Sequence, residues 1–502
     1  MDKANVAKED LVKVVEEEGE SKGIVVATLG KACSEAETLI KMIDSGMNYV
    51  RIRLCQNNSS DSNESILDCL HETFKYRPHK KCKLLVDIRG RDITIGAFED
   101  NQSFVDVDIG EDIEIYVDVE GTTPSTKSKL VTPELNIDRL LRKGDLVYIG
   151  DGSIKCSVLS NEDGTIMLRT KSEGRVYEYS SIIIPDKHSS LSIIQERDIK
   201  DLEELSKNHK IDYISIPYCQ TDEDVKVVRR LLPFLEQTII MAKIEDKNTK
   251  VFREADGVII QRRALGLSIV SEKLFALQNF LIEQCKLNAK PVLVANEIIE
   301  SMMDGAQPLR SEIADIQNSL VEGVDGVILE RETSHGMHPV EAVAAVSSTI
   351  SEAKSLVDPD KKYDTLLSVC DYEDKDELLV MNLAKIILDK DREPIDYILT
   401  LSKQGKIARL LSKYSLPVEV MACCTDSKIV KQLNLISGIK SVKVPNYTTK
   451  LLGPDHLLNI IIRTNKSMGL GKEGNWIVVF RSKEKDGSQD ETDHYFKFVK
   501  IQ

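Results

Sequence analysis

The sequence predicts a (β/α)8 barrel, with a small β-barrel domain inserted after its third strand and an open α/β domain at its C-terminal end. Eight short apolar runs, each followed by a helical pattern, recur along the first 356 residues. A segment with little helical pattern interrupts them after the third run, and a second strand-and-helix series follows them. Serial βα units are typical of a barrel whose functional groups lie at the C-terminal ends of its strands.

The length of 502 residues exceeds what one hydrophobic core supports and predicts about three domains. We expect a charged leader over 1–22, the barrel over 23–96 and 185–356, the inserted domain over 97–184 and the C-terminal domain over 357–502. The net charge of -15 and isoelectric point of about 5.2 do not suggest a nucleic-acid or membrane surface. With no run of about 18 apolar residues, we expect a cytoplasmic protein.

In the first barrel units, apolar runs typical of buried strands alternate with helical patterns. Ile24–Leu29 is an apolar run ended by Gly30, and Ser34 with Glu37 predicts a capping box at the start of a helix that ends at Gly46. The second and third strands are expected at Tyr49–Leu54 and Lys83–Asp87, with a helix over Ser65–Phe74 between them.

The inserted segment, from Ala97 to about Ile184, alternates apolar and polar residues. Period-two patterning is clear at Val105–Ile109 and Asp145–Ile149, and glycines at 110, 152 and 164 predict turns. This pattern favours a small β domain.

The barrel pattern then resumes, and a separate series follows it. The remaining barrel strands are expected at Asp212–Ile216, Thr238–Lys243, Gly257–Ile260, Pro291–Ala295 and Asp325–Leu329. The C-terminal domain is expected to contain strands near Tyr397–Leu401, Val418–Ala422, Ser441–Val444 and Trp476–Phe480.

Lys243 and Glu245 lie two residues apart at the end of the fifth barrel strand. Strand alternation sends both side chains the same way, toward the barrel mouth. A lysine and a carboxylate at that position could bind an anionic substrate and a divalent metal. The alternative is a surface ion pair.

Several motifs in order resemble those of the pyruvate kinase family. They are Ala27-Thr28-Leu29-Gly30, Gly46 to Arg51, Val86 to Gly90, Ala242 to Glu245, Glu300-Ser301-Met302, Arg310-Ser311-Glu312, Glu332-Thr333 and Pro339 to Val343. The resemblance implies phosphoryl transfer from phosphoenolpyruvate to ADP, with a divalent metal and usually potassium. It also implies roles for four residues: Lys243 at the transferring phosphoryl group, Glu245 as a metal carboxylate, Arg51 at the substrate phosphate and Asp87 at the cation site.

Other positions depart from the family pattern, and we therefore expect a divergent member with a degraded active site. Where the family has A-R-G-D-L-G, this chain has Gln261 to Gly266, so the second metal carboxylate is Ala264, which cannot coordinate magnesium, and a glycine is Arg263. Arg53 and Cys55 replace an amide and a hydroxyl of the potassium site, and Ile88 replaces a threonine there. A fixed charge at Arg53 would repel the ion or substitute for it.

Two further departures concern the nucleotide and the enolate. Thr94 stands where an arginine would meet the nucleotide phosphates, and Asn296 replaces a threonine near the enolate carbon. In the C-terminal domain, Lys403, Gly405 and Lys406 are the remnant of the family's effector loop, with fewer hydroxyl groups to hold a phosphate. We do not expect regulation by a sugar bisphosphate.

Three functional hypotheses follow. The first, which we favour on sequence, is a catalytically inactive relative that needs no cofactor and serves as a structural component of an assembly or homo-oligomer, such as a cytoskeletal or flagellar lattice. The second is a divergent working pyruvate kinase with magnesium and potassium. The third is a module that binds phosphate or an organic anion without turnover, through Lys243, Arg51, Arg262 and Arg263.

Overall fold

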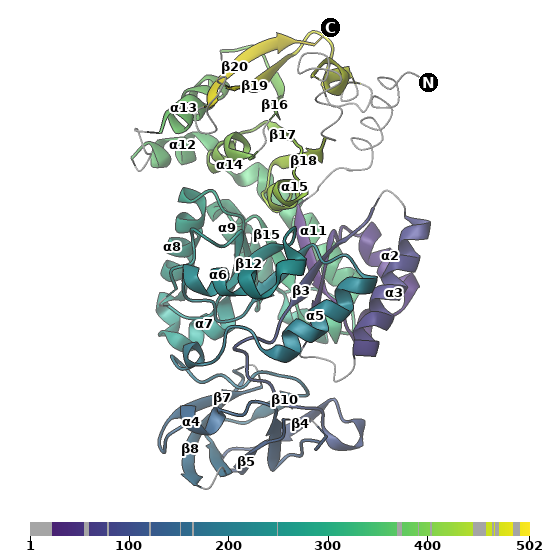
Figure 1. Cartoon of the computed structure of the whole chain (residues 1–502), viewed down its shortest axis with the longest axis vertical. Coiled ribbons are helices and arrows are strands. Elements are labelled where there is room, and N and C mark those ends of the chain that lie inside the picture. Colours follow the sequence, from purple (N-terminus) through teal and green to yellow (C-terminus); the bar gives the residue numbers. More distant parts are fainter. Residues whose placement is uncertain are drawn as a thin grey trace.

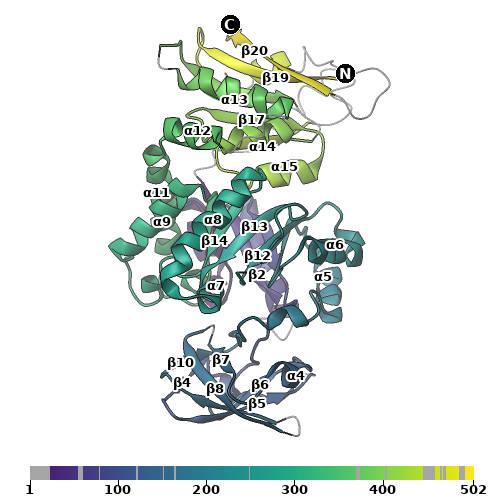
Figure 2. The ribbon, with the colours of Figure 1, turned by 90° about the vertical axis from the view of Figure 1, so that its left-hand side faces the viewer.

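The computed structural model describes residues 23–54, 60–77, 80–119, 122–150, 152–162, 165–247, 249–368, 374–389, 391–401, 404–444, 458–463, 466, 471–484 and 492–501. Figures 1 and 2 show three parts in a row, with the barrel in the middle, the inserted β domain at one end and the C-terminal domain at the other. The predicted leader, Cys55, Gly164 and Lys403 lie outside the described residues.

Eight parallel strands close into a barrel, as the sequence predicts. Around the barrel they run in the order β1-β15-β14-β13-β12-β11-β3-β2. Their bounds are β1 (Ile24–Thr28), β2 (Tyr49–Arg53), β3 (Lys83–Asp87), β11 (Tyr213–Ile216), β12 (Ile239–Ile244), β13 (Gly257–Gln261), β14 (Val292–Ala295) and β15 (Gly326–Leu329).

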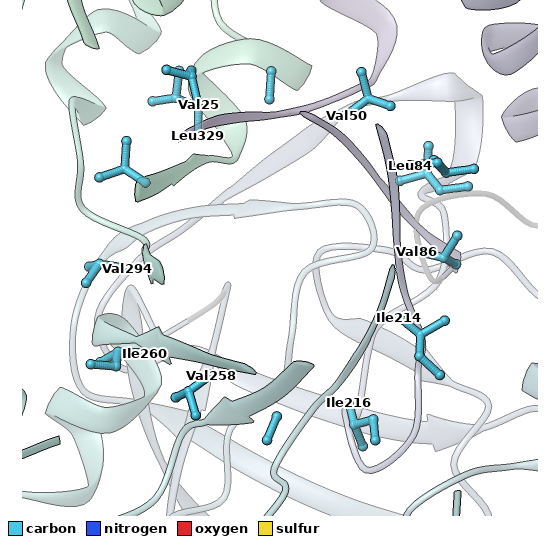
Figure 3. Close-up of a cluster of buried hydrophobic side chains, with 14 of the residues drawn as sticks. Val25, Val50, Leu84, Val86, Ile214, Ile216, Val258, Ile260, Val294 and Leu329 are labelled. Atoms are coloured by element: carbon cyan, nitrogen blue, oxygen red, sulfur yellow. The ribbon is translucent and has the colours of Figure 1, made fainter. Parts of the chain in front are cut away.

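The strands are buried on both faces, which explains why they are nearly continuous apolar runs. In β1, Val25 and Ala27 belong to the cluster that includes the covering helices, whereas Ile24 and Val26 belong to the cluster inside the barrel. Figure 3 shows part of the outer cluster, with Val25 from β1, Val50 from β2 and other strand side chains drawn as sticks. The barrel core therefore has two layers, separated by the sheet.

Helices cover the outside of the barrel. They are α2 (Ala36–Asp44), α3 (Ser60–Tyr76), α5 (Glu196–Asn208), α6 (Asp222–Leu231), α7 (Arg262–Ser268), α8 (Leu274–Leu287), α9 (Arg310–Glu322), α10 (Arg331–Ser334) and α11 (Pro339–Ala353).

The start of α2 differs from the prediction, whereas its end agrees. A short 3-10 helix at Lys31–Cys33 intervenes, so Ser34 donates to the carbonyl of Lys31 at 3.3 Å instead of capping α2. At the other end Gly46 has φ +117, and a Cβ there would lie 2.3 Å from the hydroxyl oxygen of Ser347. A left-handed, tightly packed position of this kind favours glycine.

The inserted domain leaves the barrel after β3 and has its own hydrophobic core. A five-stranded sheet, in the order β6-β5-β9-β8-β7, is accompanied by the pair β10-β4. The elements are β4 (Phe104–Val107), β5 (Asp112–Val117), β6 (Lys129–Thr132), α4 (Ile137–Leu140), β7 (Leu146–Ile149), β8 (Ile154–Glu162), β9 (Thr165–Thr170) and β10 (Gly174–Tyr177). Its core cluster contains only residues from 93 to 191.

The C-terminal domain is an open α/β sheet in the order β18-β17-β16-β19-β20. Its elements are α12 (Pro359–Leu367), α13 (Lys375–Leu388), β16 (Ile395–Leu401), α14 (Lys406–Lys413), β17 (Glu419–Cys424), α15 (Ser427–Leu433), β18 (Ile439–Lys443), β19 (Trp476–Glu484) and β20 (Thr492–Lys500). The final strand, β20, pairs antiparallel with β19 and was not predicted.

The C-terminal domain covers the end of the barrel where the strands begin. Tyr49, at the start of β2, donates its hydroxyl to the carbonyl of Asn434 at 2.9 Å, and Tyr213 donates to the carbonyl of Lys431 at 2.8 Å. Leu435 packs in the same cluster as the inner barrel residues. The opposite end, where the strands finish, faces the inserted domain.

Within the described part of the chain, no helix combines the length and the apolar character that crossing a membrane would require. The domain boundaries, the cytoplasmic location and the cytoskeletal or flagellar location stay predictions.

Candidate active site

Charged side chains converge where the barrel strands end. Asp87, the last residue of β3, lies at their centre. Its Oδ2 atom is 3.5 Å from Nζ of Lys243 and 3.7 Å from Nε of Arg53, and it accepts a hydrogen bond from Arg51. Ser215 donates its hydroxyl to Oδ1 of the same carboxylate at 2.7 Å. Strands β2, β3, β11 and β12 thus gather three cations around one buried carboxylate.

Lys243 and Glu245 point the same way, as strand alternation predicts. Nζ of Lys243 is 3.3 Å from Oε1 of Glu245, and the two residues are 3% and 6% exposed. The alternative of a surface ion pair is therefore wrong. The other oxygen of Glu245 accepts a hydrogen bond from the backbone N–H of Tyr218 at 2.5 Å, which fixes the carboxylate.

Burial and the neighbouring charges shift the pKa values of Asp87, Lys243 and Glu245 in opposite directions. Burial alone would raise the pKa of Asp87, but Arg51, Lys243 and Arg53 outweigh it and hold that pKa below its ordinary value. For Lys243, burial lowers the pKa, whereas Asp87 and Glu245 raise it, and the net shift is upward. Lys243 is therefore an ammonium ion at neutral pH. For Glu245, burial prevails over Lys243 and raises the pKa.

Glu330, which sequence reasoning missed, also belongs to the site. Its Oε1 lies 2.7 Å from Arg51, and its Oε2 accepts a hydrogen bond from the side-chain amide of Asn296 at 2.8 Å. It is the first residue after β15, so its position at the end of the eighth strand was the available signal. Arg51, assigned by resemblance to the substrate phosphate, is thus held by two carboxylates.

The residues near Glu245 fit a magnesium ion in part. Ala264, at the start of α7, lines a small cavity with Glu245 and Asp246, and it offers no oxygen ligand. Asp246 is buried and accepts a hydrogen bond from the side chain of Gln220 at 3.2 Å. Magnesium prefers carboxylate oxygens, and three carboxylates border this cavity: the buried Glu245 and Asp246, and the exposed Asp186, which pairs with Lys247 at 3.5 Å. Glu245 and Asp246 are the residues that would hold the ion.

The residues near Asp87 do not fit a potassium ion. The guanidinium of Arg53 lies against Asp87 and also reaches Asp92, with its terminal nitrogen 3.4 Å from Oδ2 of Asp92. Ile88 packs in the outer core cluster, so its side chain faces the helices and not the site. The side chain of Ile88 therefore offers no ligand to an ion beside Asp87, and its place in the potassium site stays a prediction. Cys55 lies outside the described residues.

Asp92 is a second buried carboxylate that sequence reasoning missed. It accepts a hydrogen bond from the hydroxyl of Ser181 at 3.0 Å, but its Oδ1 has no hydrogen-bond partner within the described chain. Burial raises the pKa of Asp92 to about 7, although Arg53 and Lys243 lower it. The carboxyl group is therefore partly protonated at neutral pH.

A cleft of about 510 Å³ separates the barrel mouth from the inserted domain. Gly152, Ser153 and Tyr177 line one side, and the other side includes residues of α7 and η7 (Glu300–Met303). Arg263 lines it and forms an ion pair with Glu300.

Arg262, which lines this cleft, and Thr94 bear on the anion-binding and nucleotide predictions. Arg262 donates to the carbonyl of Asn296 at 3.0 Å and pairs with Asp315, so its charge is already matched. Thr94 is buried in a β-bridge with Ser181 at the entry to the inserted domain. It carries no charge that could meet a nucleotide phosphate.

The predicted effector-loop remnant is only partly described. Gly405 has φ +67 and precedes α14, which begins at Lys406. The ammonium group of Lys406 lies 2.9 Å from Asp374 and 2.7 Å from Asp376. The charge of Lys406 is therefore already paired with carboxylates of the protein.

Comparisons with known proteins agree along most of the chain. The family model described as pyruvate kinase, barrel domain, matches residues 20–343, and the one described as pyruvate kinase, alpha/beta domain, matches residues 389–494. A pyruvate kinase of Eimeria tenella is 27% identical, with 90% of this chain and 85% of the relative covered. One of Dictyostelium discoideum is 27% identical, with 91% and 90% covered. A structure of Cryptosporidium parvum pyruvate kinase in complex with ADP superposes with a TM-score of 0.81 at 23% identity, covering both chains completely.

These relatives correct one expectation. Pyruvate kinases depend on magnesium and potassium, so the expectation that no cofactor is needed is wrong. With the closed barrel, the inserted domain and these matches, the chain belongs to the pyruvate kinase family.

Proposed function

We propose that the chain transfers the phosphoryl group of phosphoenolpyruvate to ADP at the barrel mouth. One observation carries the proposal: Arg51, Arg53 and Lys243 converge on Asp87, and Lys243 also contacts Glu245. Phosphoryl transfer is mostly a matter of placing positive charge around the transferred group and the developing enolate. The positions that carry the family motif still supply such charge.

Each side chain has a separate task in this proposal. Lys243 is charged at neutral pH and fixed by two carboxylates, so it can meet the transferred phosphoryl group without reorganising. Magnesium bound at Glu245 and Asp246 would supply further charge to the phosphate oxygens. Because Ala264 contributes no ligand, we expect magnesium to bind more weakly than it would with a carboxylate at position 264.

Arg53 supplies a fixed charge beside Asp87, at the position that the resemblance assigns to the potassium site. Its distances to Asp87 and Asp92, 3.7 and 3.4 Å, are those of an internal ion pair. Arg53 would provide part of the positive charge that the family takes from a monovalent cation.

The test is a direct assay of the whole chain. ATP formation is followed with phosphoenolpyruvate, ADP, magnesium and potassium, for the wild type, Lys243→Met and Lys210→Met. Lys210 is exposed and lies before the start of β11, at the opposite end of the barrel. Lys243→Met should lower kcat by on the order of a hundredfold or more, the size of effect seen when one transition-state donor is removed. Lys210→Met should behave as the wild type does.

An absence of ATP formation in the wild type, or equal rates in Lys243→Met, would contradict the proposal.

A second candidate is the inactive relative, serving in a protein assembly or homo-oligomer. Two observations favour it: Ala264 lines the metal cavity without offering a ligand, and Glu330 already forms an ion pair with Arg51 at 2.7 Å. A phosphate would have to displace or share that arginine. If the assay shows no turnover, a thermal shift with phosphoenolpyruvate separates the remaining cases, since a ligand of the folded state raises the apparent stability. A shift present in the wild type and absent in Lys243→Met would indicate anion binding without turnover.

A further inference from the structure

Two histidines and an aspartate meet on the outer wall of the barrel, far from the mouth. Asp68 and His71 lie three residues apart in α3, and therefore on one face of that helix. His209 directly follows α5, which packs against α3 (Figure 1). Neither the family motifs nor the site at Asp87 involves these three residues.

The geometry of the three residues is that of a small ligand set. Nδ1 of His71 is 3.3 Å from Nδ1 of His209, and Nε2 of His209 is 3.9 Å from Oδ1 of Asp68. One candidate ligand atom from each residue lies within 4.8 Å of the others. The Nδ1–Nδ1 contact is a hydrogen bond between the two rings, so an ion would bind His209 through its other nitrogen, Nε2.

His209 supplies an independent indication. It is 3% exposed, and its Nε2 has no hydrogen-bond partner among the described residues. A buried polar atom without a partner costs free energy, which a bound cation or a rearranged hydrogen bond would recover.

The surroundings complete the environment of a cation. Asp68 and His71 are exposed, so an ion can enter from solvent and keep water as its remaining ligand. Glu64, one turn before Asp68, accepts a hydrogen bond from Asn208 at 3.3 Å and adds negative charge beside His209. Imidazole nitrogens suit zinc, copper or nickel, whereas magnesium prefers oxygen ligands alone.

We propose that Asp68, His71 and His209 bind a divalent transition metal such as zinc, and that the ion joins α3 to α5. The site is separate from the magnesium site at Glu245. Its role is to clamp two neighbouring barrel helices, and its existence does not depend on turnover.

The experiment measures metal binding to the whole chain. Zinc is titrated calorimetrically in the presence of millimolar magnesium, which occupies the oxygen-lined site, and thermal unfolding is recorded with and without zinc. The wild type should bind one equivalent and should unfold at a higher temperature with zinc. His71→Ala, a change at an exposed position, should weaken binding at least tenfold and abolish the thermal shift. Asp68→Asn should weaken binding less.

Two control variants make the result specific. Glu72→Gln changes the next exposed residue of α3, and Cys69→Ser removes the neighbouring thiol; both should bind zinc as the wild type does. Cobalt bound in place of zinc should show no thiolate-to-metal charge-transfer band. The proposal is overturned if the wild type shows no saturable binding, if His71→Ala binds equally well, or if Cys69→Ser loses the site.

Discussion

Replacing Asp92 by asparagine should change how stability depends on pH. In the folded protein, burial raises the pKa of Asp92 from 3.8 to about 7. Between these values the unfolded chain has lost the proton that the folded chain keeps, so wild-type stability falls as pH rises from about 4 to 7. A shift of about 3 units at about 1.4 kcal/mol each makes the full cost about 4 kcal/mol above pH 7.

Asparagine does not titrate, so it removes this cost. The free energy of unfolding of Asp92→Asn, minus that of the wild type, should therefore increase by about 1.4 kcal/mol per pH unit through this window and level off above pH 7. Urea denaturation at pH 5, 6, 7 and 8 measures the difference. Any hydrogen bond lost at Ser181 or Arg53 adds an offset, but the slope reports the titration.

Asp44→Asn is the matched control. Asp44 is held by Arg77, which lowers its pKa to about 2, so it titrates below the measured range in the folded protein. Its difference from the wild type should be flat from pH 5 to 8. A flat difference for Asp92→Asn as well would show that the carboxyl group is ionised at neutral pH and would refute the reasoning.

Two predictions concern the ions. Ala264→Asp adds a carboxylate to the cavity beside Glu245 and should tighten magnesium binding by on the order of tenfold or more, since even outer-shell partners alter metal affinity by about 10–100-fold. The measurement is the dependence of kcat on magnesium concentration. Ala264→Asn adds no charge and should gain less affinity, and an equal gain would show that the added carboxylate does not bind the ion. Arg53→Ser removes the guanidinium beside Asp87 and should make turnover rise more steeply with potassium than in the wild type, whereas Arg53→Lys should respond as the wild type does. If serine and lysine behave alike at position 53, the charge of Arg53 is not what matters.

The barrel could be predicted because its strands are short, apolar and regularly followed by helices. Buried parallel strands need apolar residues on both faces, and this requirement is visible in a run such as Ile24–Thr28. The strand β20 was missed, because its alternation of aromatic and lysine residues follows an acidic stretch that dominates the composition. The start of α2 was misplaced because a capping box and a preceding 3-10 turn use the same residue types.

The site could be predicted only where the strand itself sets the direction of a side chain. Alternation along β12 predicts that Lys243 and Glu245 point the same way, and their side chains are in contact in the structure. The contacts of Glu330 and Asp92 depend on how eight strands close, which no local pattern contains. A single carboxylate after a strand indicates a place at the barrel mouth, but not its partner.

The C-terminal domain packs against the end of the barrel where the strands begin, and this packing affects how cooperatively the two domains unfold. Leu435 of the C-terminal domain lies in the cluster inside the barrel, and Ser437 donates its backbone N–H to the buried side chain of Asp325 at 2.9 Å. Among the described residues, the core cluster of the inserted domain contains residues from 93 to 191 and none from the barrel interior. We therefore expect the barrel and the C-terminal domain to unfold as one cooperative unit, and the inserted domain to open locally at lower free energy. Its amides would exchange with solvent while the rest of the molecule remains folded.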